Sequence, residues 1–160
     1  MIHPLFTTRI EEISAVLAMT MPTILKEVDK TGCYVCIGDP TTGLPMLLIP
    51  FGEISDEKAE KYCQFALEKS RRLAQNREYR SSFHTRNPDE QKFAGAIRGY
   101  GLILSCSGLP EMMDEAAMLT LAVGMHELSI DEADGIVKAT GNILFWSDCK
   151  EKFFADENKK

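Results

Sequence analysis

The sequence predicts a single domain of the α+β class, within the broader α/β group, in which helices and strands share one core. The chain has 160 residues, which is the length of one domain and enough to bury a core without disulfides or metals. Apolar residues recur at helical spacing in several segments, whereas short apolar runs between turn-forming residues have the pattern of strands. The sequence shows no internal repeat and no low-complexity segment.

The first predicted elements are a helix and a hairpin. Thr8, with a glutamate three residues later, forms a capping-box pattern, and the apolar spacing that follows predicts a helix over residues 9–28. Pro22 lies inside this segment and lacks a backbone N–H, so we expect the helix to kink or restart there. Apolar runs at residues 34–37 and 45–51 flank a turn rich in glycine, proline and threonine, which predicts a β-hairpin.

A second helix, an irregular loop and two short strands are expected next. Ser55 and the two acidic residues after it predict a helix start, and apolar periodicity continues to about Gln75. Residues 76–92 show no periodicity, and a loop of more than about 12 residues in a compact domain is usually functional or disordered. Residues 93–100 and 102–105 then have the pattern of two short strands.

The C-terminal part is predicted to be mainly helical. Pro110 opens a helix over residues 110–127, and a serine cap and a final glycine bound a shorter helix over residues 129–141. The apolar residues 143–146 are expected to dock on the domain, with a frayed end after them.

Composition and charge disfavour several classes of function. The net charge is −6 and most cations alternate with acids, so we expect no basic face for nucleic acid. No apolar run approaches the roughly 18 residues of a membrane helix, and the N-terminus lacks the pattern of a secretion signal. Five cysteines at irregular spacing favour a reducing compartment. The expected protein is cytoplasmic, without membrane or nucleic-acid partners.

One segment departs from this charge balance. The cations between residues 71 and 92 are Arg71, Arg72, Arg77, Arg80, His84, Arg86 and Lys92. They either present positive charge to an anionic ligand or keep a solvated loop soluble. His84 is either an ordinary surface histidine or an axial ligand of haem iron beneath this loop.

The junction between the last predicted strand and the following helix is the other candidate site. Its residues are Ser105, Cys106, Ser107 and Gly108, followed by Pro110. A strand that ends at a helix N-terminus gathers unpaired N–H groups and the positive end of a dipole, which can hold an anion; an ordinary turn has the same pattern. Asp114 either complements the helix dipole or faces the pocket. Cys106 is either a thiol of lowered pKa or a buried structural residue.

The sequence contains none of the common zinc-protease, hydrolase, phosphate-loop or dinucleotide motifs. Cys33 and Cys36 have the spacing of half a zinc site. However, residues three apart on a strand point to opposite faces, and no second ligand pair follows. Buried small side chains explain this pair better than a metal site does.

Three patterns occur in a characteristic order. They are Val-x-Ile-x-Asp-x-x-x-Gly at residues 35–43, Ala-x-x-Lys at residues 66–69, and Ser-x-Ser-Gly-x-Pro-x-x-x-Asp-Glu-Ala at residues 105–116. Together they resemble the GlcG-like or HbpS-like family, also called the haem-degrading-domain family, which includes the C-terminal domain of some cobalamin adenosyltransferases. The resemblance covers about residues 8–127. Residues 1–128 would form this domain, and residues 129–160 a C-terminal helical extension packed on or extending it.

The resemblance implies a profilin-like antiparallel sheet of about five strands flanked by helices, in homo-oligomers. It also implies a ligand, often haem or another tetrapyrrole such as cobalamin. The family's ligand-covering loop corresponds to residues 81–92. Its junction corresponds here to Ser105, Ser107, Gly108, Pro110, Asp114 and Glu115.

The favoured interpretation is a homo-oligomeric protein that binds a small, anionic ligand between the junction and the cationic loop. The residues expected to contact the ligand are Arg80, His84, Arg86, Ser105, Cys106, Ser107, Gly108 and Asp114. One alternative is a non-enzymatic assembly or sensor subunit whose partner surface is formed by residues 143–146. Another is an enzyme acting on a small acid, with Cys106 or His84 as participants.

Overall fold

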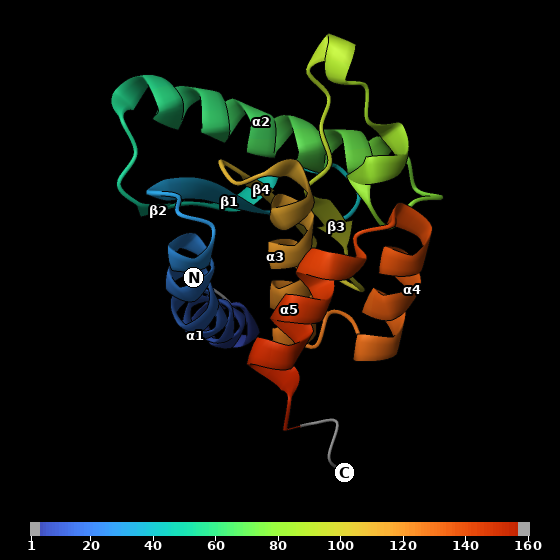
Figure 1. The fold of residues 1–160 in the computed structure, drawn as a ribbon. Coiled ribbons are helices and arrows are strands. Elements are labelled where there is room, and N and C mark those ends of the chain that lie inside the picture. The colour runs from blue at the N-terminus through green and yellow to red at the C-terminus, as the bar shows by residue number, and fades with distance from the viewer. Residues whose placement is uncertain (1–3, 157–160) are drawn as a thin grey trace.

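The computed structural model describes residues 4–156 of the chain. In chain order its elements are α1 (Pro4–Glu27), β1 (Gly32–Gly38), β2 (Pro45–Gly52), α2 (Asp56–Gln75), the short 3₁₀ helices η1 (Ser82–Thr85) and η2 (Pro88–Glu90), β3 (Ala96–Arg98), β4 (Ile103–Ser107), α3 (Glu111–Gly124), α4 (Ile130–Thr140) and α5 (Ile143–Phe154). Helix α2 lies across one face of the sheet, and α1 and α3 lie on the other (Figure 1). Helix α5 packs against α3 on the side away from the sheet. The described residues therefore form one α+β domain, as predicted.

The sheet has four antiparallel strands in the order β2-β1-β4-β3, rather than about five. The position beside β3 holds only an isolated bridge, in which Ser81 lies opposite Ile97. The Ser81 side chain then accepts a hydrogen bond from the Phe83 N–H, and the chain turns into η1. Because this local bond starts a 3₁₀ turn, the segment leaves β3 after one bridge and forms no fifth strand.

Helix α1 is longer and more continuous than the sequence predicts. It begins at Pro4, so Thr8 lies inside the helix and is not its cap. It also passes through Pro22 without restarting. Met21 and Ile24, on either side of this proline, are fully buried in the core. Their packing offsets the backbone hydrogen bond that the proline removes.

The other helix boundaries follow from their caps. Ser55 is the N-cap of α2 as predicted, although its side chain makes no capping bond. The capping box of α4 is formed by Ser129 and Glu132, and Gly141 ends that helix in a left-handed conformation. Helix α3 ends at Gly124, earlier than predicted, because Glu127 leaves the helix to accept a hydrogen bond from the Gly101 N–H.

The C-terminal segment docks on the domain as predicted, but as a full helix that continues to Phe154. Trp146, Cys149 and Phe154 occur at helical spacing on α5 and are buried in the main core. The Trp146 indole N–H also donates to Asp134 of α4 at 2.7 Å. Residues 157–160, where part of the frayed end was expected, lie outside the described residues.

The two faces of the sheet differ in chemistry. The face toward α1 and α3 carries the main apolar core, to which α4 and α5 also contribute. The face toward α2 has a much smaller apolar cluster and several buried polar side chains: Lys69, Ser70, Arg72 and Ser105. None of the described helices combines the length and apolarity that are needed to span a bilayer. The polar layer beneath α2 is where the candidate site lies.

We predict that Gly135→Ala stabilises the protein by about 0.5–1 kcal/mol. Gly135 is exposed on α4, and an added Cβ would meet no atom within 4 Å, so the substitution gains helix propensity without a clash. Urea unfolding followed by circular dichroism measures the change. Ala139→Gly, at another exposed position of α4, is the matched control and should destabilise the protein by a similar amount. A destabilised Gly135→Ala protein would contradict the packing described for α4.

Candidate functional site

A buried ion pair lies at the predicted junction. Lys69 of α2 and Asp114 of α3 are only 2% and 3% exposed, and the Lys69 Nζ lies 2.9 Å from Asp114 Oδ2. The same Nζ donates to the backbone carbonyl of Cys106 in β4 at 2.7 Å. Asp114 Oδ1 accepts from the Leu109 N–H at 3.1 Å. Each charge is thus paired and also hydrogen bonded, which is the condition for burying an ion pair at acceptable cost.

A glycine makes this close approach of lysine and carboxylate geometrically feasible. Gly95 has a φ of 125°, a conformation that other residues rarely adopt. A Cβ at this position would lie 2.8 Å from the Asp114 Cβ and 2.9 Å from the Lys69 Nζ. Gly95 is therefore required both by its backbone conformation and by the space that the ion pair occupies.

A hollow of about 320 Å³ lies over the ion pair, and we call it the junction hollow. It is lined by Lys30, Lys61, Tyr62, Phe65, Lys69, Phe93, Ser107, Gly108, Leu109, Glu111 and Asp114. Three of these side chains are aromatic, and the Phe65 and Phe93 rings meet edge to face with their centroids 5.7 Å apart. The junction hollow thus combines an apolar wall with a charged floor, as small-molecule sites commonly do.

The rim of the junction hollow carries an excess of positive charge. The carboxylate of Glu111 is occupied, because it makes two contacts of 2.9 Å with the Arg86 guanidinium and accepts from the Ala94 N–H. Asp114 is occupied by Lys69. Lys30 and Lys61 are exposed and have no ion-pair partner among residues 4–156. An anion bound in the hollow could therefore pair with Lys30 and Lys61 without breaking an ion pair of the described residues.

Burial changes the pKa of Asp114, which lies at the floor of the junction hollow. Desolvation raises the pKa of the Asp114 carboxyl to about 6, although the Lys69 ammonium and the bonds from its neighbours pull in the opposite direction. The carboxyl group thus exchanges its proton close to neutral pH. Titratable groups with such shifts tend to occur at functional sites.

The structure decides the role of Cys106. Its side chain is fully buried in β4, and burial raises the pKa of its thiol well above the usual range. The alternative of a thiol with a lowered pKa is therefore wrong, because desolvation outweighs the field of the helix N-terminus. Cys33 packs in the main core with it, while Cys36 lies on the opposite face near Ser70.

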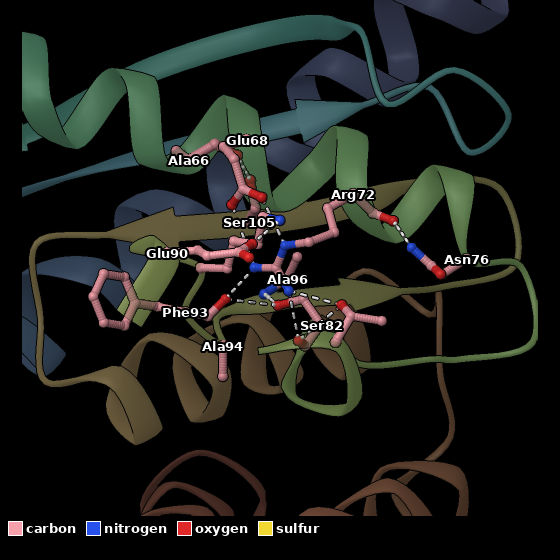
Figure 2. Close-up of polar contacts among 12 residues, drawn as sticks. Ala66, Glu68, Arg72, Asn76, Ser82, Glu90, Phe93, Ala94, Ala96 and Ser105 are labelled. Atoms are coloured by element: carbon pink, nitrogen blue, oxygen red, sulfur yellow. Dashed lines mark hydrogen bonds and ion pairs between the residues drawn. The ribbon is translucent and has the colours of Figure 1, made fainter. Parts of the chain in front are cut away.

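Arg72, predicted as one of the cations of the loop, instead binds the loop from α2 (Figure 2). Its guanidinium is buried and donates to the carbonyl oxygens of Ser82 and Phe93, while Glu68 pairs with it on α2. Thr85 accepts a further hydrogen bond of 2.7 Å. One arginine thus holds both ends of the segment between η1 and Phe93, although that segment has little regular structure.

Most of the other loop cations also have partners within the chain. Arg80 pairs with Glu132 at 3.2 Å, and Lys92 pairs with Glu90. His84 stacks on Tyr79 with ring centroids 5.0 Å apart. Arg80 and His84 line a separate hollow of about 260 Å³, which shares no lining residue with the junction hollow.

The structure therefore divides the predicted site residues into groups. Ser107, Gly108 and Asp114 line the junction hollow, and Arg86 reaches its rim through Glu111. Ser105 lies beneath α2 and donates to the Ala66 carbonyl at 2.6 Å, so its hydroxyl has a structural partner. Arg80 and His84 lie at the other hollow. The pocket is thus bounded by α2 and Phe93 rather than by the whole cationic loop.

Glu115, which the resemblance places at the junction, is fully buried but lies elsewhere in the network. It accepts hydrogen bonds from Ser81, from Thr140 at 2.8 Å and from Asn142 at 3.2 Å. These bonds join the start of η1 to the segment between α4 and α5. Glu115 thus fixes the surrounding framework rather than lining the hollow.

Sequence reasoning missed the residues of α2 that form the site. Lys61, Tyr62, Phe65 and Lys69 all line the junction hollow. A signal for Lys69 was present, because it lies three residues after Ala66 and four before Leu73, on the buried stripe of the helix. A lysine in the middle of such a stripe indicates a buried partner.

Comparison with known proteins adds no assignment. No protein-family model, no curated protein and no solved structure matches the chain. The GlcG-like resemblance stays a prediction based on its motifs, and the functional argument depends on the geometry of the site.

We predict that Asp114 makes folding stability fall as the pH rises from about 4 to about 6. The folded protein holds this proton up to a pKa of about 6, whereas the unfolded chain releases it near the usual value of 3.8. The stabilisation is complete below the lower value and is lost through the upper one, with a slope of at most about 1.4 kcal/mol per pH unit. Urea unfolding at several pH values, for wild type and Asp114→Asn, measures it. Parallel profiles for the two proteins would contradict the prediction.

Proposed function

We propose that this protein binds a small organic anion with an apolar or aromatic body in the junction hollow. The observation that carries the proposal is that Lys30 and Lys61, at the rim of an aromatic-walled hollow, have no ion-pair partner among residues 4–156. The carboxylates of the lining are already neutralised by Lys69 and Arg86. An anion gains charge-assisted hydrogen bonds there without displacing an existing pair.

The size of the hollow favours a metabolite over a macrocycle. Its volume of about 320 Å³ is at the lower end of the range of roughly 300–1,000 Å³ that is typical of ligand pockets. The residues around it do not fit haem well, because its lining includes no histidine and His84 lies at the other hollow. A tetrapyrrole is therefore the less favoured ligand of this site.

The proposal keeps two expectations from the sequence, one from the resemblance and one from the cysteine content. The strand order is compatible with a profilin-like sheet that lacks one edge strand, and the single bridge at Ser81 marks where that strand would lie. A cytoplasmic location agrees with the five cysteines, all of which are free.

Calorimetric titration with 3-phenylpropanoate tests the binding proposal, with 3-phenylpropanamide as the neutral ligand of the same shape. We expect the anion to bind with a Kd of about 0.1–1 mM, which is usual for a ligand of this size. The amide should bind about tenfold more weakly, because it loses the charge-assisted contacts. Equal affinity of acid and amide would contradict the role of the lysines, and no binding by a panel of aromatic acids would overturn the proposal.

Two variants and a haem titration complete this experiment. Lys61→Ser should weaken binding of the acid about three- to tenfold, whereas Lys58→Ser, at an exposed position of α2 outside the hollow, should not. A Soret shift with haem that is lost in His84→Ala would assign a tetrapyrrole to the second hollow. That result, with no binding of aromatic acids, would replace the small-anion proposal.

A second candidate function is an assembly subunit that associates through α5. Ile143, Leu144 and Phe145 are 60%, 80% and 37% exposed, and three consecutive exposed apolar residues are unusual on a monomer. Trp146, the fourth residue of the predicted surface, is buried and belongs to the core instead. Deletion of the chain after Gly141 would therefore remove core residues, and point substitutions are the better test.

We predict that Leu144→Lys dissociates an assembly that forms through this surface. A charge at a residue that is 80% exposed leaves the domain folded but is costly to bury against a second copy. Light scattering after size-exclusion chromatography measures the mass. Gln64→Lys, on α2, adds the same charge far from α5 in the sequence and should have no effect. A wild-type protein that is monomeric at high concentration would argue against this function.

A further inference from the structure

The geometry points to a covalent role for the floor of the junction hollow: Lys69 captures the carbonyl group of an anionic ligand as an imine. This inference rests on the proposed function, because the same hollow has to hold the ligand. It adds the chemical class of the ligand, which would be an aldehyde or ketone that carries a carboxylate and an apolar body. A 2-oxo acid with an apolar side chain combines these groups in one small molecule.

The position of the Lys69 nitrogen supports this role. Nζ is held by two acceptors, the Cys106 carbonyl at 2.7 Å and Asp114 Oδ2 at 2.9 Å. A neutral amine has two N–H bonds and one lone pair, so both hydrogen bonds persist when the ammonium loses a proton. The lone pair then takes the remaining tetrahedral direction. The nitrogen is thus fixed in orientation before a ligand arrives, which lowers the entropic cost of attack.

Asp114 assists the proton transfers that the reaction needs. The third proton of the Lys69 ammonium is directed at neither acceptor and passes to solvent, and the free amine forms a C–N bond to the carbonyl carbon. The carbonyl oxygen then receives a proton, and a second proton transfer lets it leave as water while the C=N bond forms. Amine and carbonyl become imine and water, so no oxidant or reductant is required. A carboxyl group with a pKa of about 6 serves as both base and acid near neutral pH.

Lys69 differs from the other lysines of the hollow in its surroundings. Lys30 and Lys61 are exposed, so their ammonium groups lie in solvent at the rim of the hollow. Lys69 is 2% exposed and lies where water is largely excluded. Lysines that form imines are commonly held in desolvated sites of this kind. The exposed lysines are suited to attract the carboxylate, and the buried one to react.

Reductive trapping tests the inference with phenylpyruvate and sodium cyanoborohydride on the full chain at pH 7. The imine is reduced to a stable amine, and peptide mass spectrometry after Glu-C digestion locates it. We expect the Lys69 adduct to exceed that at any other lysine by at least tenfold. Phenylacetone, which lacks the carboxylate, should label Lys69 about tenfold less. Excess phenyllactate, which lacks the carbonyl group, should compete and suppress the labelling.

The outcomes separate the inference from the proposed function. If phenyllactate binds but phenylpyruvate labels all lysines equally or none, Lys69 capture is wrong and anion binding stands. If neither acid binds, the proposed function itself fails. Because the adduct is located on the wild-type protein, the result does not depend on any variant being folded.

A variant provides a second, independent readout. Lys69→Arg keeps a positive charge beside Asp114 but has no nucleophilic amine. The variant, checked for folding by circular dichroism, should give no adduct with phenylpyruvate at this peptide. Continued labelling of the same peptide in Lys69→Arg would overturn the assignment.

Discussion

The buried Lys69–Asp114 ion pair is the interaction on which the rest of the site depends, because it joins helices on opposite faces of the sheet. Lys69 comes from α2 and Asp114 from the first turns of α3. The Cys106 carbonyl of β4 accepts from the same lysine, so the pair also fixes the strand between the two helices. Loss of one partner would leave an uncompensated buried charge, at a cost of about 3–5 kcal/mol. Helices α2 and α3, on opposite faces of the sheet, are thus both held at the Lys69–Asp114 pair.

The ion pair also constrains the residues around the hollow. Residue 95 has to be glycine, because a Cβ there would clash with both Asp114 and Lys69. The Leu109 N–H has to face Asp114, which sets the approach of the chain to α3. Arg72 performs a comparable role one turn further along α2, where it binds the carbonyls that border the irregular loop. The polar layer under α2 therefore orders a region that has little regular structure of its own.

The sequence was sufficient for elements whose signals are local. Ser129, Glu132 and Gly141 specify both ends of α4 through contacts within a few residues, and α4 was predicted almost to the residue. Effects of contacts between residues far apart in the sequence could not be predicted from it. Glu127 shortens α3 by binding Gly101, which is far away in the sequence. Of the site residues, Ser107, Gly108 and Asp114 were predicted from the strand-to-helix pattern. Lys61 and Lys69 were not among the predicted ligand contacts, and the partners of Lys69, Asp114 and Cys106, lie on other elements.

The presence of an ion pair in this layer is itself an argument for function. A buried pair is weak evidence for stability, because apolar residues of similar volume often replace one at no cost. The other face of the sheet carries the much larger apolar core, so most of the packing of the domain does not depend on this ion pair. Here the charged groups lie directly under a hollow with two further cations at its rim. Desolvation is costly for Asp114 and raises its pKa, yet it gives the floor of the hollow a group that exchanges protons near neutral pH. That cost is best explained if the pair acts on a ligand.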